Sequence, residues 1–157
     1  MEIERKYTLK ELPANLDSYP FHLIEQAYLN TKPVVRIRKQ DDEYYLTYKG
    51  SGMMAREEYN LPLNEESYYH LLEKADGIVI TKKRYIIPLT DFQPDNKYNL
   101  VIELDIFQGK LAPLIIAEIE FPTEEMANSF APPELFSEDV TFDPKYHNSN
   151  LSKGIQV

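Results

Sequence analysis

Met1-Glu2-Ile3-Glu4-Arg5-Lys6-Tyr7-Thr8 is a stretch with a period of two. Successive side chains of a β-strand point to opposite faces, so Glu2, Glu4 and Lys6 would line one face. Two carboxylates and an ammonium group then share one surface. A single strand of this kind is more often the solvated face of an ordinary sheet than a binding site. The stretch gains weight because its pattern recurs.

The same period of two appears in segments that lie far apart along the chain. In residues 101–107 and 116–121 the side chains between the acids are apolar. The apolar side chains therefore face a core, and the charged side chains face something else. The charged pairs that fall on one face are Arg36 with Arg38, Arg56 with Glu58, Lys82 with Arg84, Glu103 with Asp105, and Glu118 with Glu120.

Water is the simplest candidate for what the charged face meets. An ordinary wet face mixes Ser, Thr, Gln and Lys, and it rarely repeats closely spaced like charges because they repel. We instead favour a closed barrel with a charged interior, in which carboxylates hold a hard cation and basic groups hold a polyanion. The candidate face carries the acids Glu2, Glu4, Glu103, Asp105, Glu118 and Glu120, and the bases Lys6, Arg36, Arg38, Lys49, Arg56, Lys82 and Arg84.

Turn residues divide the chain into eight expected strands and a few helices, which predicts an α+β fold: an eight-stranded antiparallel β-barrel with flanking helices. Asn64 and Thr123 are expected helix caps, because each precedes a pair of Glu residues. The expected strands are residues 1–8, 22–30, 34–39, 43–49, 54–63, 78–88, 98–107 and 114–121. The expected helices are residues 65–75 and 123–130, with a final short helix within 144–152.

Length and composition place limits on the function. The 157 residues predict a single domain, residues 1–157, and the absence of cysteine excludes disulfides and thiolate metal sites. A net charge of -9 argues against a general nucleic-acid-binding surface, so a polyanion would need a local basic pocket. No membrane-spanning run or signal peptide is evident, which makes the cytoplasm the default location. The sequence leaves monomer and homodimer open.

The residues also resemble a known family. Glu2-Ile3-Glu4-Arg5-Lys6 matches the ExExK signature of the CYTH domain, or triphosphate tunnel metalloenzyme superfamily. The likeness covers nearly the whole chain and is similar to the small bacterial single-domain members. The further matching segments, in order, are residues 26–29, 36–38, 46–49, 56–58, 82–85, 103–107, 117–121 and 139–141.

This resemblance implies an eight-stranded antiparallel tunnel, a triphosphate substrate and a divalent metal, Mg²⁺ or Mn²⁺. Arginine can offer two parallel donors to phosphate oxygens, whereas lysine acts as a point charge. For any one of these side chains an exposed ion pair is the plainer interpretation, but the shared face and the resemblance favour substrate binding for the set. The expected substrate ligands are Lys6, Arg36, Arg38, Lys49, Arg56, Lys82 and Arg84.

Oxygen ligands without cysteine favour Mg²⁺, Mn²⁺ or Ca²⁺ over zinc. Glu2, Glu4 and Glu120 are the first-choice metal ligands. A second group would hold another ion or orient the attacking water. Its members are Glu58, Glu103, Asp105 and Glu118.

Tyr28 and Lys82 match positions that resemble a proposed catalytic pair in some relatives. Burial among cations would lower the pKa of a lysine toward the range of a general base. The alternative is that Tyr28 is an aromatic residue of the tunnel wall and Lys82 only a phosphate ligand. The three histidines have no metal-ligand spacing and are expected at the surface.

We predict metal-dependent hydrolysis of tripolyphosphate, with water attacking a terminal phosphorus. No pocket for an organic base is evident, although Phe21, Tyr44, Tyr48 or Tyr85 could stack on a ring. The alternatives are therefore a nucleoside or thiamine triphosphatase, and then a class IV-type adenylate cyclase. RNA 5′-triphosphatase is a further activity of the family that the chain resembles. A non-catalytic polyphosphate-binding module, with the same basic cluster, is the alternative of a different class.

Overall fold

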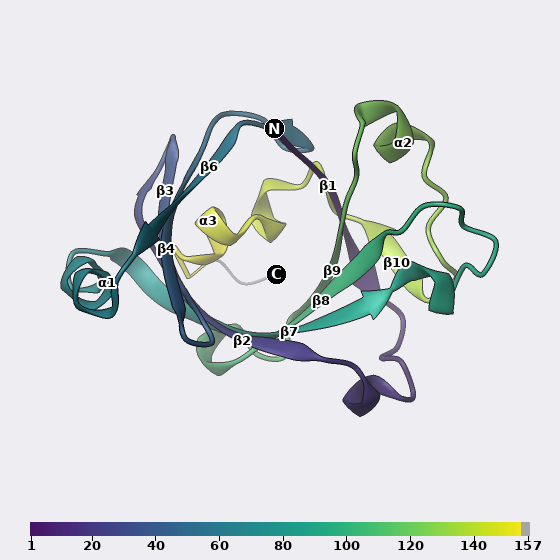
Figure 1. Cartoon of the computed structure of the whole chain (residues 1–157), viewed down its shortest axis with the longest axis horizontal. Coiled ribbons are helices and arrows are strands. Elements are labelled where there is room, and N and C mark those ends of the chain that lie inside the picture. The colour runs from purple at the N-terminus through teal and green to yellow at the C-terminus, as the bar shows by residue number, and fades with distance from the viewer. Residues whose placement is uncertain (155–157) are drawn as a thin grey trace.

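A computed structural model describes residues 1–154 of the chain. Its strands form one antiparallel sheet that curls into a ring (Figure 1). Along the ring the order is β10-β1-β9-β8-β7-β2-β3-β4-β6, and β5 pairs with β1. The strands are β1 (Glu2–Leu9), β2 (Phe21–Thr31), β3 (Val34–Gln40), β4 (Glu43–Lys49), β5 (Ala55–Arg56), β6 (Glu58–Leu63), β7 (Asp76–Pro88), β8 (Val101–Phe107), β9 (Ile115–Glu120) and β10 (Phe136–Asp139).

The fold class is confirmed, but the described residues form ten strands rather than the expected eight. The strand expected over residues 54–63 is interrupted at Glu57. Its first part, β5, pairs with β1 through Glu2 and Arg56, and its second part, β6, pairs with β4 through Lys49 and Glu58. The two parts therefore join opposite ends of the sheet, which closes the ring. The second extra strand is β10, a short strand beside Tyr7 of β1.

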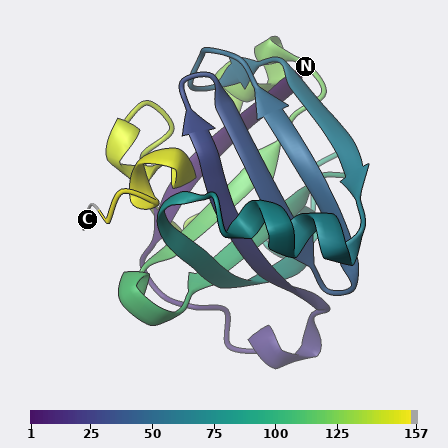
Figure 2. The same cartoon turned by 90° about the vertical axis from the view of Figure 1, so that its left-hand side faces the viewer.

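Short helices decorate this ring. α1 (Glu65–Leu72) begins at a capping box in which Asn64 accepts from the Ser67 backbone, and it crosses the outside of the ring (Figure 2). α2 (Glu124–Ser129) is capped by Thr123, as expected, and α3 (Asn148–Leu151) falls within the final expected helix. No helix in residues 1–154 is long and apolar enough to cross a membrane. The 3₁₀ helices are η1 (Leu16–Ser18), η2 (Leu89–Asp91), η3 (Gly109–Leu111) and η4 (Pro144–Tyr146).

The largest apolar core lies outside the ring rather than within it. Ile3, Leu104 and Ile119 project outward from β1, β8 and β9 and pack with Leu100 and Ala127. Strict alternation along these strands then turns the intervening charged side chains inward. The expectation that the apolar residues face a core and the charged residues face something else is confirmed in this way.

A smaller apolar cluster closes one end of the ring. Leu151 of α3 is fully buried and packs with Tyr28, Ile80 and Phe107. Figures 1 and 2 show α3 lying across that end of the barrel. The closely approaching backbone needs a glycine at residue 77, where φ is +71° and a Cβ atom would lie 2.1 Å from the Ser152 carbonyl oxygen.

Candidate active site

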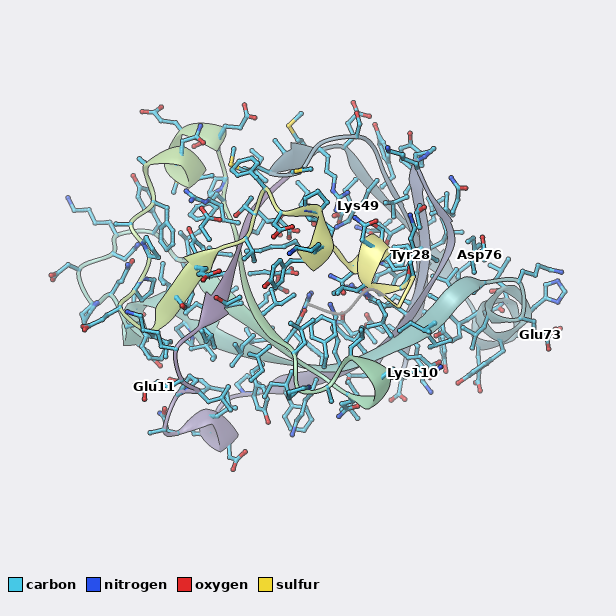
Figure 3. The ribbon with its side chains drawn as sticks, turned by 180° about the vertical axis from the view of Figure 1, so that it is seen from behind. Glu11, Tyr28, Lys49, Glu73, Asp76 and Lys110 are labelled. Atoms are coloured by element: carbon cyan, nitrogen blue, oxygen red, sulfur yellow. The ribbon has the colours of Figure 1, made fainter. Side chains whose placement is uncertain are left out.

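The interior of the barrel is a cavity of about 720 Å³ with charged walls. Of the fifteen side chains expected in the site, all but Lys82 and Asp105 line it. Many of them are more than nine-tenths buried, so this surface is not the wet face of an open sheet. In Figure 3, Tyr28 and Lys49 lie beside the interior, whereas Glu11 and Glu73 lie at opposite outer ends of the molecule. The structure therefore gathers the expected residues, and their individual roles stay predictions.

One wall holds a group of buried side chains joined by ion pairs, here called the paired cluster: Lys6, Lys82, Arg84, Asp105 and Glu118. Asp105 receives two hydrogen bonds from Arg84, at 2.7 and 2.9 Å, and an ion pair from the Lys82 Nζ atom at 2.7 Å. Lys6 Nζ lies 2.7 Å from Glu118 Oε1. These contacts follow from register, because Lys6 lies opposite Glu118 and Arg84 lies opposite Asp105 on neighbouring strands.

The paired cluster shifts the proton affinity of its members. Burial alone would raise the pKa of Asp105 and of Glu118, but the neighbouring Arg84, Lys82 and Lys6 charges outweigh it and hold both pKa values below the usual range. Burial lowers the pKa of Lys82 to about 7, with the attraction of Asp105 opposing that shift. Both carboxylates are thus ionised near neutral pH.

Lys82 is enclosed behind the cavity wall, with a fully buried ammonium group. Tyr28 does line the cavity, but among residues 1–154 no hydrogen bond joins it to Lys82. The two expected acid–base partners are thus not joined by a hydrogen bond in the described residues. Their pairing therefore remains a prediction.

Two arginines on the opposite wall have no carboxylate partner among the described residues, and we call Arg36 and Arg38 the unpaired arginines. Arg38 donates through Nε and a terminal nitrogen to Gln26 Oε1, and Arg36 donates to Thr47 Oγ1 at 3.1 Å. The Arg36 Nε atom is buried without a partner. Burial and the charges of Arg36 and Arg84 lower the pKa of Arg38 to about 10. Buried cations with spare donors are an anion site.

Glutamates crowd a third part of the cavity, and we call Glu2, Glu4, Glu58, Glu103 and Glu120 the glutamate group. Lys49 lies between two of them, with Nζ 2.8 Å from Glu2 and 3.5 Å from Glu58. Glu120 reaches solvent and forms no ion pair within residues 1–154. Partial burial and the charges of neighbouring carboxylates nevertheless raise the pKa of Glu120 to about 7.

The same crowding shows in the other glutamates. Burial and a hydrogen bond to Glu58 raise the pKa of Glu2. Burial would also raise the pKa of Glu58, but the hydrogen bond with Glu2 and the charge of Lys49 outweigh it and lower that pKa to about 2. Burial raises the pKa of Glu103 even beside Arg84. All-oxygen donors and mutual repulsion fit a hard divalent cation. As they stand, however, no three described His, Cys, Asp or Glu side chains converge as a metal-ligand group.

The structure adds residues that sequence reasoning missed. Asn148 and Ser149 of α3 line the cavity, and Gln26 holds Arg38. His147 is 5% exposed and bonds through Nε2 to the Thr141 carbonyl, so the expectation of a surface position was wrong for this histidine. Residue type gave no signal here, because only the fold brings the C-terminal segment back to the barrel.

The chain resembles known proteins in both sequence and structure. A family model described as the CYTH domain matches residues 1–153. An inorganic triphosphatase of Nitrosomonas europaea is 35% identical, covering 98% of each chain. One from Acetivibrio thermocellus is 40% identical over 76% of this chain and 71% of its own.

Solved structures give the same likeness. The crystal structure of the inorganic triphosphatase NE1496 superposes with a TM-score of 0.71 at 32% identity, covering 100% of this chain and 97% of that one. A protein of Pyrococcus horikoshii, PH1012, shares the fold alone, with a TM-score of 0.59 at 22% identity over 82% of this chain and 84% of its own.

Proposed function

This chain belongs to the CYTH-domain family, and we propose that it is an inorganic triphosphatase that depends on a divalent metal ion. The observation that carries the proposal is the coexistence in one cavity of cations without anions and of carboxylates that share too few cations. Within residues 1–154 the buried Arg36 and Arg38 have no carboxylate partner, Lys49 serves two glutamates, and Glu120 forms no ion pair. A triphosphate bound together with a metal ion would supply both missing charges. The names of the two curated relatives support inorganic triphosphate as the substrate.

The arginines would hold the substrate. Arg36 and Arg38 keep their planes fixed through Thr47 and Gln26, so their remaining donors are oriented before any anion arrives. Lys6, Lys49, Arg56 and Arg84 add positive charge around the same space. Donors already in place stabilise negative charge that develops on the leaving diphosphate without further reorganisation.

The glutamate group would hold the metal. Glu120, with Glu2 and Glu4, remains the first choice, since the pKa of Glu120 and of Glu2 is raised where a cation would lower it. Asp105 and Glu118 already form ion pairs with Lys82, Arg84 and Lys6. They are therefore expected to support the metal site without binding the ion directly. A bound divalent ion supplies Lewis-acid polarisation of phosphoryl oxygens.

Water would attack the terminal phosphorus in line with the leaving diphosphate oxygen. Tyr28 lines the cavity, so its hydroxyl is the member of the expected acid–base pair that can meet this water. Lys82 is enclosed and would act on the cavity chiefly through its charge and its contacts. Direct proton abstraction by Lys82 would require its amine to reach the cavity.

Organic triphosphates are the second candidate. Of the four aromatic residues that could stack on an organic ring, only Tyr44 lines the cavity, while Phe21, Tyr48 and Tyr85 do not. Tyr28 and Tyr45 also line the cavity and could meet a ring. The buried arginines and the names of the two curated relatives nevertheless favour inorganic triphosphate.

Phosphate release from tripolyphosphate, ATP and thiamine triphosphate, each with Mg²⁺, Mn²⁺ or EDTA, tests the proposal. We expect metal-dependent release that is far faster from tripolyphosphate. Glu4→Gln should abolish it while the protein stays folded, and Glu73→Gln, at an exposed site outside the barrel, should not. Binding of tripolyphosphate without turnover would instead indicate a non-catalytic module, and turnover in Glu4→Gln would contradict the metal assignment.

A further inference from the structure

Asn148 joins two side chains, Gln26 and Lys82, through one oxygen atom. It is the first residue of α3, is partly buried and lines the cavity. Its Oδ1 atom accepts from Gln26 Nε2 at 3.1 Å and from Lys82 Nζ at 3.2 Å. Gln26 in turn accepts from Arg38. Arg38 and the enclosed Lys82 are therefore linked through the side-chain amides of Gln26 and Asn148.

The polarity of this network is fixed from one end. Arg38 has only donors, so Gln26 must turn its carbonyl oxygen toward it and its NH₂ group toward Asn148. Asn148 must then present Oδ1 to Gln26, and the same oxygen suits the Lys82 ammonium group. The orientation of the Asn148 amide follows from its neighbours and leaves its Nδ2 atom on the other side.

The Nδ2 group of Asn148 has no hydrogen-bond partner within residues 1–154. Its residue lines the cavity, whereas Lys82 does not. A positive charge held at the carbonyl oxygen of an amide polarises the N–H bonds at its other end and makes them stronger donors. Asn148 can thus present to the cavity the charge of a lysine that is itself enclosed.

The backbone that carries Asn148 is well anchored. The preceding His147 bonds to the Thr141 carbonyl, and Leu151 is fully buried. The Ser152 carbonyl accepts from the backbone of Ile78 at 2.7 Å. A donor on such a segment keeps its position before a ligand binds, which lowers the entropy lost on binding.

We propose that Asn148 is a substrate-binding residue whose Nδ2 group donates a hydrogen bond to a phosphoryl oxygen, while its Oδ1 atom is held by Gln26 and Lys82. The inference rests on the proposed function for its ligand, inorganic triphosphate. It extends the site beyond the basic side chains, to a neutral amide from the C-terminal segment.

The test measures the Kd of tripolyphosphate by calorimetry in EDTA and its KM with Mg²⁺, for the wild type and three variants. Asn148→Ala removes the donor and should raise both constants roughly tenfold, as expected for a hydrogen bond to a charged group. Asn148→Asp keeps an oxygen for Gln26 and Lys82 but cannot donate, so it should bind more weakly still. Ser149→Asp places the same charge one residue along the cavity wall and should weaken binding less than Asn148→Asp.

Unchanged constants in Asn148→Ala would overturn the inference. So would recovery of wild-type binding in Asn148→Asp, because that result means that only the acceptor matters. Equal weakening by Asn148→Asp and Ser149→Asp would also overturn the inference, because it would show that only the added negative charge matters. If Asn148→Ala does not fold, Asn148→Asp carries the test, since it keeps both contacts. A wild type that binds without turnover refutes only the hydrolase, and one that neither binds nor cleaves tripolyphosphate refutes both proposals.

Discussion

The paired cluster and the unpaired arginines carry similar side chains in one barrel, yet only the first is neutralised. Arg84 lies opposite Asp105 on the neighbouring strand, so register supplies a partner. Arg36 lies between Tyr28 and Thr47, and Arg38 lies between Gln26 and Tyr45. All four neighbours of the unpaired arginines are neutral. The residue opposite a buried charge on the adjacent strand thus decides whether that charge is paired within the protein or remains free to pair with a ligand.

This difference has an energetic meaning. Removing one partner from a buried ion pair leaves the other charge without solvent or counter-ion, which is strongly unfavourable. A buried cation that never had a partner already carries that penalty, and an anionic ligand relieves it. The first group should therefore dominate stability and the second should dominate binding.

The largest effect should come from breaking the paired cluster. Asp105→Asn leaves both Lys82 and Arg84 short of their main counter-ion, so we expect a loss of roughly 3–5 kcal/mol in the free energy of unfolding. Urea denaturation measures it. Asp76→Asn, at an exposed residue of β7, should change that free energy by less than about 0.5 kcal/mol. A similar small change in Asp105→Asn would show that the cluster is not a structural ion pair.

The next effect should appear in binding alone. Arg36→Met removes a buried cation that has no carboxylate partner in the described part of the chain, so the free energy of unfolding should stay level or rise. The Kd for tripolyphosphate should rise about tenfold or more, since charged hydrogen bonds are lost. Calorimetry and denaturation of the same preparation measure the two quantities. Marked destabilisation without a change in Kd would reverse the comparison.

A change outside the barrel should do the opposite of Arg36→Met. Asn64 caps α1, and its side chain accepts from the Ser67 backbone. Asn64→Ala should lower the free energy of unfolding by about 1 kcal/mol. The Kd for tripolyphosphate should not change, because Asn64 does not line the cavity. A change in Kd would mean that α1 shapes the site, whereas Asn64→Asp, which also caps, should restore stability.

The smallest effect should be a pH dependence from the glutamate group. The folded protein raises the pKa of Glu120 from 4.5 to about 7, so the folded state binds this proton more tightly than the unfolded state. The contribution of Glu120 to the free energy of unfolding is therefore fully present at a pH below its pKa in the unfolded state, and it is lost as the pH rises through about 7. Solvent screening at this exposed side chain keeps the effect below about 1 kcal/mol.

Melting temperatures between about pH 5 and pH 8 measure this loss. Glu120→Gln should flatten the curve and raise the melting temperature at the upper end, whereas Glu11→Gln, outside the cavity, should leave its shape unchanged. Mg²⁺ should stabilise the wild type more at the upper end than at the lower. A melting temperature that rises with pH in the wild type but not in Glu120→Gln would contradict the claim that neighbouring carboxylates repel ionised Glu120.

The alternating charges were enough to predict the barrel and most of its lining. Inward and outward positions alternate along a strand, so a local pattern identified Glu2, Arg36 and Glu118 as interior residues. Local pattern also predicted the caps at Asn64 and Thr123. These features depend only on residues that are close together in the sequence, which is why the sequence was enough to predict them.

Features that depend on contacts distant in sequence were not predicted. The break at Glu57 exists because one strand must pair with β1 and then with β4, and β10 is too short to show a period. The pairing of Lys82 with Asp105 requires register as well as parity. Asn148 enters the site only because α3 folds back across the barrel.

The most direct test of the division between paired and unpaired charges is the melting temperature of the wild type with tripolyphosphate, with Mg²⁺ and with both. A ligand that binds only the folded state raises that temperature. We expect each ligand alone to raise it, because within residues 1–154 Arg36 and Arg38 have no carboxylate partner and Glu120 forms no ion pair, and we expect the two together to raise it further. A melting temperature that responds to neither ligand would contradict the existence of charges reserved for substrate and metal.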